Sequence, residues 1–168
     1  MKHNNKAIKF LDDFYQKFEY KYDAPYRIKT LTQLKSDGYG HCADVSYNAS
    51  LLAQEHFDLP FNFAYWNLKQ KDASIGHIAY VLQLEEGVRL YSHSSVQGLS
   101  LQKTFNTIED IFTHAKGAFA NSVFDLQYGF PIEAKHLVIP GDTSFVNLNA
   151  AIKNARMFAM IKNIDNIS

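Results

Sequence analysis

The sequence predicts an α+β fold, in which an antiparallel sheet packs against a helix that begins at the only cysteine, Cys42. Two observations lead to this prediction. Apolar residues recur at helical spacing after Cys42. A β-favouring run, a turn and a second run between residues 77 and 94 predict a hairpin. Helices gathered against an antiparallel sheet are typical of the α+β class.

The first two predicted elements are helices. An amphipathic helix that covers the core and ends before Pro25 is indicated by apolar residues at spacings of three and four, namely Ile8, Leu11, Tyr15, Phe18 and Tyr22. The segment from Arg27 to Lys35 is ambiguous between a short helix and an extended lead-in, because Pro25 and Gly38 bound it closely. We favour the short helix.

The stretch around Cys42 predicts a turn followed by a helix. Turn-forming residues precede the cysteine, and apolar residues spaced for one helix face follow it up to a predicted end near Phe57. Unpaired N–H groups and the helix dipole in a first turn favour a thiolate, the nucleophilic form. The alternative is that Cys42 is a small buried apolar residue, as most free cysteines are. Asp44 either favours this turn electrostatically or contacts a substrate amine.

The next elements are three strands. Alternating apolar residues predict a strand over residues 61–66, and the polar segment from Lys69 to Ser74 predicts a loop. His77 then opens an apolar strand, and residues 88–94 form the return strand of the hairpin. A thiol nucleophile needs a base, and the base needs a third group to orient it. His77 is the candidate base.

The length of the hairpin turn decides which residue is the third group. A three-residue loop that ends with Gly87 in the left-handed conformation pairs residues whose numbers sum to 172, so that His77 and His93 share a face. A two-residue loop at residues 86–87 places Ser92 or Ser94 on that face instead. We prefer His93.

The second half of the chain predicts smaller elements. Thr107 and Asp110 resemble a capping box for a helix through Lys116, with Gly117 after it. The other expected elements are a short strand within residues 96–103, strands over 122–130 and 134–140, and a helix over 145–161.

The stretch GYGHCADVSYNASLLAQEHFDLP and the hairpin together resemble the transglutaminase-like branch of the papain-like superfamily. Shared features are a cysteine at a helix start, a histidine opening a strand and a polar residue on the next strand. Arylamine acetyltransferases have a similar stretch, and the hairpin is similar to the Cys–His–His arrangement of cell-wall amidases of the NlpC/P60 type. In the transglutaminase-like pattern an aspartate followed by proline stands where this chain has YSHSS, and an aromatic residue stands where it has Ile78.

The residues and the resemblance imply a cysteine-dependent acyl-transfer enzyme without a cofactor. Cys42, His77 and His93 would be its catalytic residues, and a protein, peptide or small-molecule amide its substrate. The N–H of Cys42, helped by Tyr39 or Gln33, would stabilise the oxyanion. The alternative function is a catalytically inert papain-like binding or inhibitory module.

Composition narrows the class of protein further. The 168 residues fit one domain spanning residues 1–168, and 46% apolar residues predict a folded core. A formal net charge of +0 argues against nucleic-acid and anionic-membrane partners. A single cysteine and the lack of a long apolar run lead us to expect a cytoplasmic protein. Adjacent His41 and Cys42 match no zinc-ligand spacing, so we expect no metal.

Overall fold

The chain is built around a five-stranded antiparallel sheet with strand order β6–β5–β4–β3–β7. The computed structural model describes residues 2–22, 28–70, 73–96, 98–120 and 133–139. Its sheet strands are β3 (Phe61–Gln70), β4 (Ala73–Leu84), β5 (Gly87–Ser92), β6 (Leu101–Phe105) and β7 (Glu133–Ile139). The predicted α+β class and antiparallel sheet are thereby confirmed.

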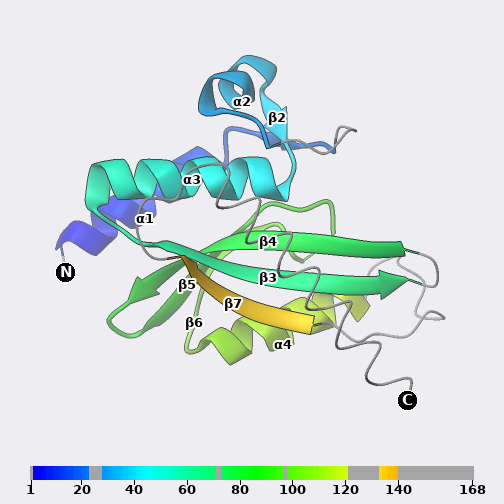
Figure 1. Cartoon of the computed structure of the whole chain (residues 1–168). Coiled ribbons are helices and arrows are strands. Elements are labelled where there is room, and N and C mark those ends of the chain that lie inside the picture. Colours follow the sequence, from blue (N-terminus) through cyan, green and yellow to red (C-terminus); the bar gives the residue numbers. More distant parts are fainter. Residues whose placement is uncertain (1, 23–27, 71–72, 97, 121–132, 140–168) are drawn as a thin grey trace.

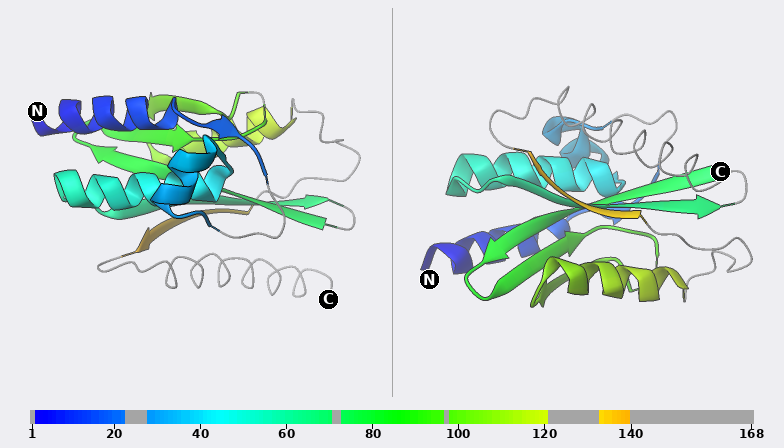
Figure 2. Two further views of the ribbon diagram at one scale, coloured as in Figure 1. Left: turned by 90° about the horizontal axis from the view of Figure 1, so that it is seen from above. Right: turned by 60° about the horizontal axis from the view of Figure 1, so that its bottom comes forward.

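Helices cover both faces of this sheet. Helices α1 (Lys2–Tyr15) and α3 (Cys42–Phe57) lie side by side on one face, and α4 (Ile108–Ala120) lies on the other (Figures 1 and 2). The short helix α2 (Leu31–Asp37) and a parallel pair of two-residue strands, β1 (Glu19–Tyr20) and β2 (Tyr39–Gly40), sit at the N-terminal end of α3. None of the described helices is both long and apolar enough to cross a bilayer.

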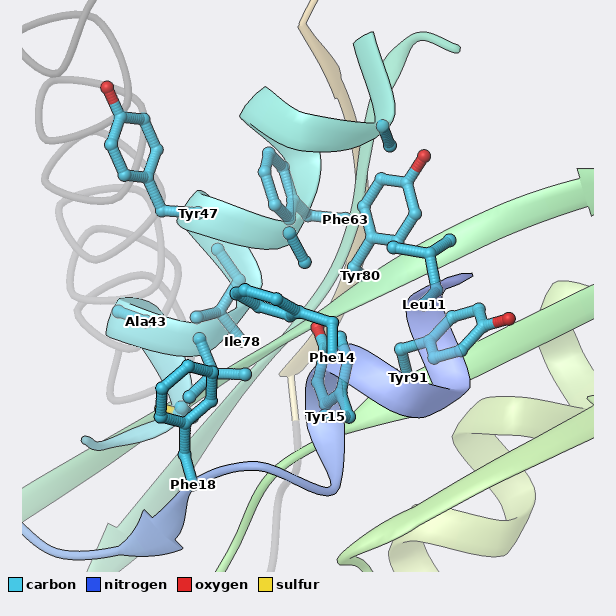
Figure 3. Close-up of a cluster of buried hydrophobic side chains, with 14 of the residues drawn as sticks. Leu11, Phe14, Tyr15, Phe18, Ala43, Tyr47, Phe63, Ile78, Tyr80 and Tyr91 are labelled. Carbon is cyan, nitrogen blue, oxygen red and sulfur yellow. The ribbon is translucent and has the colours of Figure 1, made fainter. Parts of the chain in front are cut away.

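The alternation of side chains along the strands divides the core into two clusters. The α1 and α3 side contains large apolar and aromatic residues of the sheet, including Tyr65. Figure 3 shows Phe63, Ile78, Tyr80 and Tyr91 of this set with their helix partners. The α4 side contains smaller ones, including Ala64, Ala79, Val81, Val88 and Leu90. Residues of opposite parity on one strand therefore serve different layers.

The predicted helices are confirmed with shifted ends. Helix α3 begins at Cys42 and ends at Phe57, where Asp58 has φ 53°. The N-terminal helix stops at Tyr15, so the predicted extension to Tyr22 is wrong, and Tyr22 is 57% exposed. Helix α2 starts late because the side chains of Thr30 and Gln33 form a capping box.

Several predicted boundaries are also wrong. Most of the polar loop from Lys69 to Ser74 is strand, because β3 and β4 pair as far as Gln70 and Ala73. The capping box of Thr107 and Asp110 is confirmed by two hydrogen bonds of 3.1 Å, but α4 continues through Gly117. The short strand expected within 96–103 is β6, and the one over 134–140 is β7. The strand over 122–130 and the helix over 145–161 lie outside the described residues.

The register of the β4–β5 hairpin corrects our preferred turn. Its pairs, from Leu84–Gly87 to Tyr80–Tyr91, have numbers that sum to 171, and the turn consists of residues 85–86. Gly87 has φ 111°, and a Cβ there would overlap the carbonyl oxygen of Phe105. By the parity of this register, Ser92 and not His93 shares the face of His77.

Helix α1 is fixed to the sheet by an arginine on β5. The Nη2 group of Arg89 donates to both carboxylate oxygens of Asp12, at 2.9 and 3.0 Å, and Nε donates to Tyr91 Oη at 3.2 Å. Both charged side chains are largely buried, with 17% and 28% exposed. By contrast, Asp13 faces solvent and pairs with exposed Lys9, at 3.5 Å.

We expect Asp12→Ala to lower the free energy of unfolding by about 1.5–3 kcal/mol, because it removes charge-assisted hydrogen bonds from a shielded guanidinium. The matched substitution one residue further, Asp13→Ala, should cost less than about 0.5 kcal/mol. Urea denaturation of both variants measures the difference. Equal losses would show that the Arg89 contact does not anchor α1.

Candidate active site

The start of α3 is fixed by an unusual N-terminal cap. Nδ1 of His41 accepts the N–H of Ala43 at 3.1 Å, and Oδ2 of Asp44 accepts the N–H of His41 at 3.0 Å. These reciprocal bonds form a capping box in which an imidazole replaces the usual hydroxyl. The structure makes His41 the buried cap that precedes Cys42.

Asp44 also ties a neighbouring segment to the first turn of α3. Its Oδ1 accepts the N–H of Lys29 at 2.7 Å, while Asn48 Nδ2 donates to the carbonyl of Lys29 at 2.9 Å. Asp44 is fully buried, and both of its oxygens have partners within the protein. The electrostatic and structural interpretation of Asp44 therefore accounts for its position without a substrate amine.

Gly40 allows β2 to lie close to this turn. A Cβ at Gly40 would lie 2.7 Å from Leu34 Cδ1 and 2.9 Å from Asp44 Cβ. Both distances are far below ordinary van der Waals contact, so any side chain would push α2 and α3 apart. The absence of a side chain two residues before Cys42 is thus part of the site.

The Cys42 side chain is 7% exposed and points toward β4. Burial raises the pKa of its thiol from 9.0 to about 11, and nearby Asp44 adds to this effect. Hydrogen bonds from the N–H groups of Ile78 and Ala43 act in the opposite direction but are outweighed. The expected lowering of the thiol pKa is therefore wrong for this structure, and the thiol stays protonated at neutral pH.

His77 directly precedes Ile78, the residue whose N–H faces the sulfur. Its Nε2 lies 2.9 Å from Ser92 Oγ, and both residues are buried. By parity, His77 and Ser92 belong to the α4 side of the sheet, whereas Cys42 approaches from the α3 side. The β4–β5 ladder extends no further than Tyr80–Tyr91 among the described residues. Thiol and imidazole thus adjoin neighbouring residues of β4, beyond the end of that ladder, but from opposite faces of the sheet.

Burial keeps the His77 ring uncharged at neutral pH, as it does the thiol of Cys42. Burial, and then repulsion from His93, lowers the pKa of the His77 ring from 6.5 to about 3. Ser92 supplies a hydrogen bond but no negative charge. Thiol and imidazole are therefore both neutral at neutral pH.

His93 lies just beyond the end of β5 and has a different environment. Its ring packs against Tyr20, with ring centroids 5.5 Å apart. Burial lowers the pKa of His93, while hydrogen bonding with the carbonyls of Glu19 and Gly40 and the charge of Asp44 raise it. The structure thus brings His93 near His77, but the hydrogen-bond partner of His77 is Ser92.

Tyr20 is a site residue that the sequence analysis missed. Pairing of β1 with β2 sets Tyr20 opposite Gly40. Burial, followed by the neighbouring Cys42 and opposed by a hydrogen bond with Ser95, raises the pKa of its phenol to about 12. No local pattern could have found it, because the pairing joins residues about twenty positions apart.

The side chains of the two predicted oxyanion donors make contacts away from Cys42. Oε1 of Gln33 accepts the N–H of Thr30 at 2.9 Å in the exposed cap of α2. The ring of Tyr39 lies beneath the ammonium groups of Lys29 and Lys21, at 3.7 and 4.2 Å from its centroid. This leaves the N–H of Cys42 as the predicted donor that lies at the site.

Within the described ranges, no three His, Cys, Asp or Glu side chains gather closely enough to hold a metal ion. Comparison with protein-family models and with curated proteins gives no match.

Because its pKa is raised to about 11, native Cys42 should react with iodoacetamide at pH 8 about 100-fold more slowly than the same thiol in urea, as two pKa units require. Mass spectrometry of timed samples measures both rates. Fast modification of the native protein near pH 6 would show that the thiol is instead ionised.

The depressed pKa of His77 predicts an acid-dependent loss of stability. Between pH 6.5 and about 3 the unfolded chain binds a proton that the folded chain does not, so the free energy of unfolding falls as the pH falls through this window. The contribution approaches about 1.4 kcal/mol per pH unit. His77→Gln should flatten the profile, whereas the control His56→Gln, at an exposed position, should not. Urea denaturation at each pH tests this, and parallel profiles for wild type and His77→Gln would contradict it.

Proposed function

We propose that this protein is a cysteine-dependent acyl-transfer enzyme of the papain-like or transglutaminase-like kind, acting on a peptide or small-molecule amide. The observation that carries the proposal is the position of the thiol. Cys42 faces the N–H of Ile78, the residue after His77, and Nε2 of His77 lies 2.9 Å from Ser92 Oγ. In the proposal these residues are the nucleophile, the base and the orienting group, and the His77 ring reaches the sulfur beyond the end of the β4–β5 ladder.

The pKa values of the thiol and the imidazole argue against a preformed ion pair, so the proposal requires proton transfer during the attack itself. With the thiol near 11 and the imidazole near 3, the proton moves to His77 while sulfur attacks the carbonyl carbon. The imidazolium then protonates the leaving amine, and the acyl group stays on sulfur. The N–H of Cys42, at the start of α3, donates to the developing oxyanion.

Ser92 replaces His93 as the proposed orienting group. When Ser92 Oγ accepts the Nε2–H of His77, Nδ1 carries the lone pair that takes the thiol proton. A serine fixes the tautomer but adds no charge, unlike the aspartate of the transglutaminase-like pattern. This difference agrees with a neutral resting pair.

An inert binding module is the second candidate, and the burial of Cys42 favours it. A thiol that is 7% exposed and has a raised pKa also fits a small core residue. The two functions differ in whether His77 accelerates a reaction at sulfur.

p-Nitrophenyl acetate, an activated acyl donor that needs no specific recognition, should separate them. We expect wild type to form acetyl-Cys42, seen by intact mass, and His77→Ala to form it about 10²–10⁴-fold more slowly because the base is lost. Ser92→Ala should fall between these two variants, and Cys42→Ala gives the background. Equal acetylation rates for wild type and His77→Ala would support the binding module.

A further inference from the structure

The ring of His93 contains a buried nitrogen that the proposed chemistry does not use. His93 is 5% exposed, and its Nε2 has no hydrogen-bond partner among the described residues. Since Nε2 has no partner, Nδ1 is the nitrogen that faces the carbonyls of Glu19 and Gly40. Carbonyl oxygens only accept, so Nδ1 carries the hydrogen and Nε2 is left as a bare acceptor. A buried acceptor without a donor is costly unless another molecule supplies one.

The surroundings of His93 also favour its taking up a proton, more than those of His77 do. Two carbonyl groups and the carboxylate of Asp44 stabilise a positive charge on the His93 ring. The pKa of His77 is lowered by burial and by the repulsion of His93, and no contribution that raises it accompanies them. Of the two histidines, His93 therefore has the better environment for a base that holds a proton.

His93 and the sulfur of Cys42 share Tyr20 as a neighbour. Tyr20 packs on the His93 ring, and its phenol adjoins Cys42. The β1–β2 pair fixes this tyrosine relative to the start of α3.

We propose, on the basis of the proposed acyl transfer, that Nε2 of His93 binds the nucleophile of the second half-reaction, water or a primary amine, and takes its proton. The site then has two bases: His77 for attack by the thiol and His93 for release of the acyl group.

The step balances without a further reactant. The oxygen or nitrogen of the nucleophile bonds to the thioester carbon, and its proton passes to Nε2 of His93. The carbon–sulfur bond then breaks with its electron pair on sulfur. The thiolate recovers a proton from the His93 imidazolium, so that both residues return to their neutral forms.

The test uses the full chain and p-nitrophenyl acetate, with His93→Gln as the variant, because glutamine keeps a polar side chain but cannot act as a base. We expect His93→Gln to form acetyl-Cys42 at nearly the wild-type rate and to lose the acetyl group about 10²–10⁴-fold more slowly, so that acetyl-enzyme accumulates. His114→Gln is the matched control and should behave as wild type, because the ring of His114, on α4, bonds the carbonyl of Gly98 at 2.8 Å. Adding glycine amide and measuring acetylglycine amide shows whether water or an amine is the preferred nucleophile.

The outcomes separate this inference from the proposed function. If no variant forms acetyl-Cys42 in a His77-dependent way, the proposed function fails and the inference fails with it. If acetyl-Cys42 forms but His93→Gln releases acetate at the wild-type rate, only the inference is overturned, and Nε2 then accepts from a structural water. Equal slowing of both half-reactions also overturns it, because His93 would then act as a positioning residue for His77.

A measurement on wild type keeps the test independent of variant folding. Acetyl-enzyme formed at pH 7 and transferred to lower pH should lose its acetyl group more slowly, through one ionisation below pH 6.5, because burial lowers the pKa of His93 from that value. A release rate that stays constant over this range would overturn the proposal.

Discussion

The seating of α3 on a single residue of β4 is the interaction on which the rest of this structure depends. Ser46 Oγ donates to the carbonyl of Ile78 at 3.3 Å and accepts the phenol of Tyr15 from α1, also at 3.3 Å. One turn earlier, Cys42 faces the N–H of the same residue. Both backbone groups of Ile78 thereby face α3, and α1, α3 and β4 are in contact at this point of the sheet.

This close seating explains the chemistry of the thiol. A helix N-terminus stabilises a nearby negative charge by about 0.3–1 kcal/mol, whereas one pKa unit corresponds to about 1.4 kcal/mol. An upward shift of two units therefore requires a burial cost that clearly exceeds the dipole and the N–H contacts. The packing that brings the sulfur against β4 also removes the water that would stabilise a thiolate, so this close packing opposes ionisation of the thiol.

The sequence predicted those features that depend on local patterns. The start of α3 at Cys42, its end at Phe57 and the Thr107–Asp110 cap were all readable, because each is set by residues within one or two turns. The partner of His77 was not, because a one-residue difference in turn length changes which face every residue of β5 occupies. Tyr20 was hidden for another reason: its neighbours come from a parallel pairing with residues distant along the chain. Helical spacing likewise suggested a longer first helix, since Phe18 is buried as the spacing requires although the chain there has left the helix.

The bare backbone at Gly40 has a consequence for recognising distant relatives of this chain. Because Leu34 and Asp44 both occupy the space where a side chain would begin, residue 40 cannot vary while the helix start keeps its shape. His41 and Asp44 are coupled to one another by their reciprocal cap. The informative signature is therefore the short string Gly-His-Cys-x-Asp, in which Gly40, His41 and Asp44 constrain one another and Cys42 faces the N–H of Ile78. A search with this string should still find relatives whose overall sequence identity is low, because each of its specified residues is constrained by a contact in the structure.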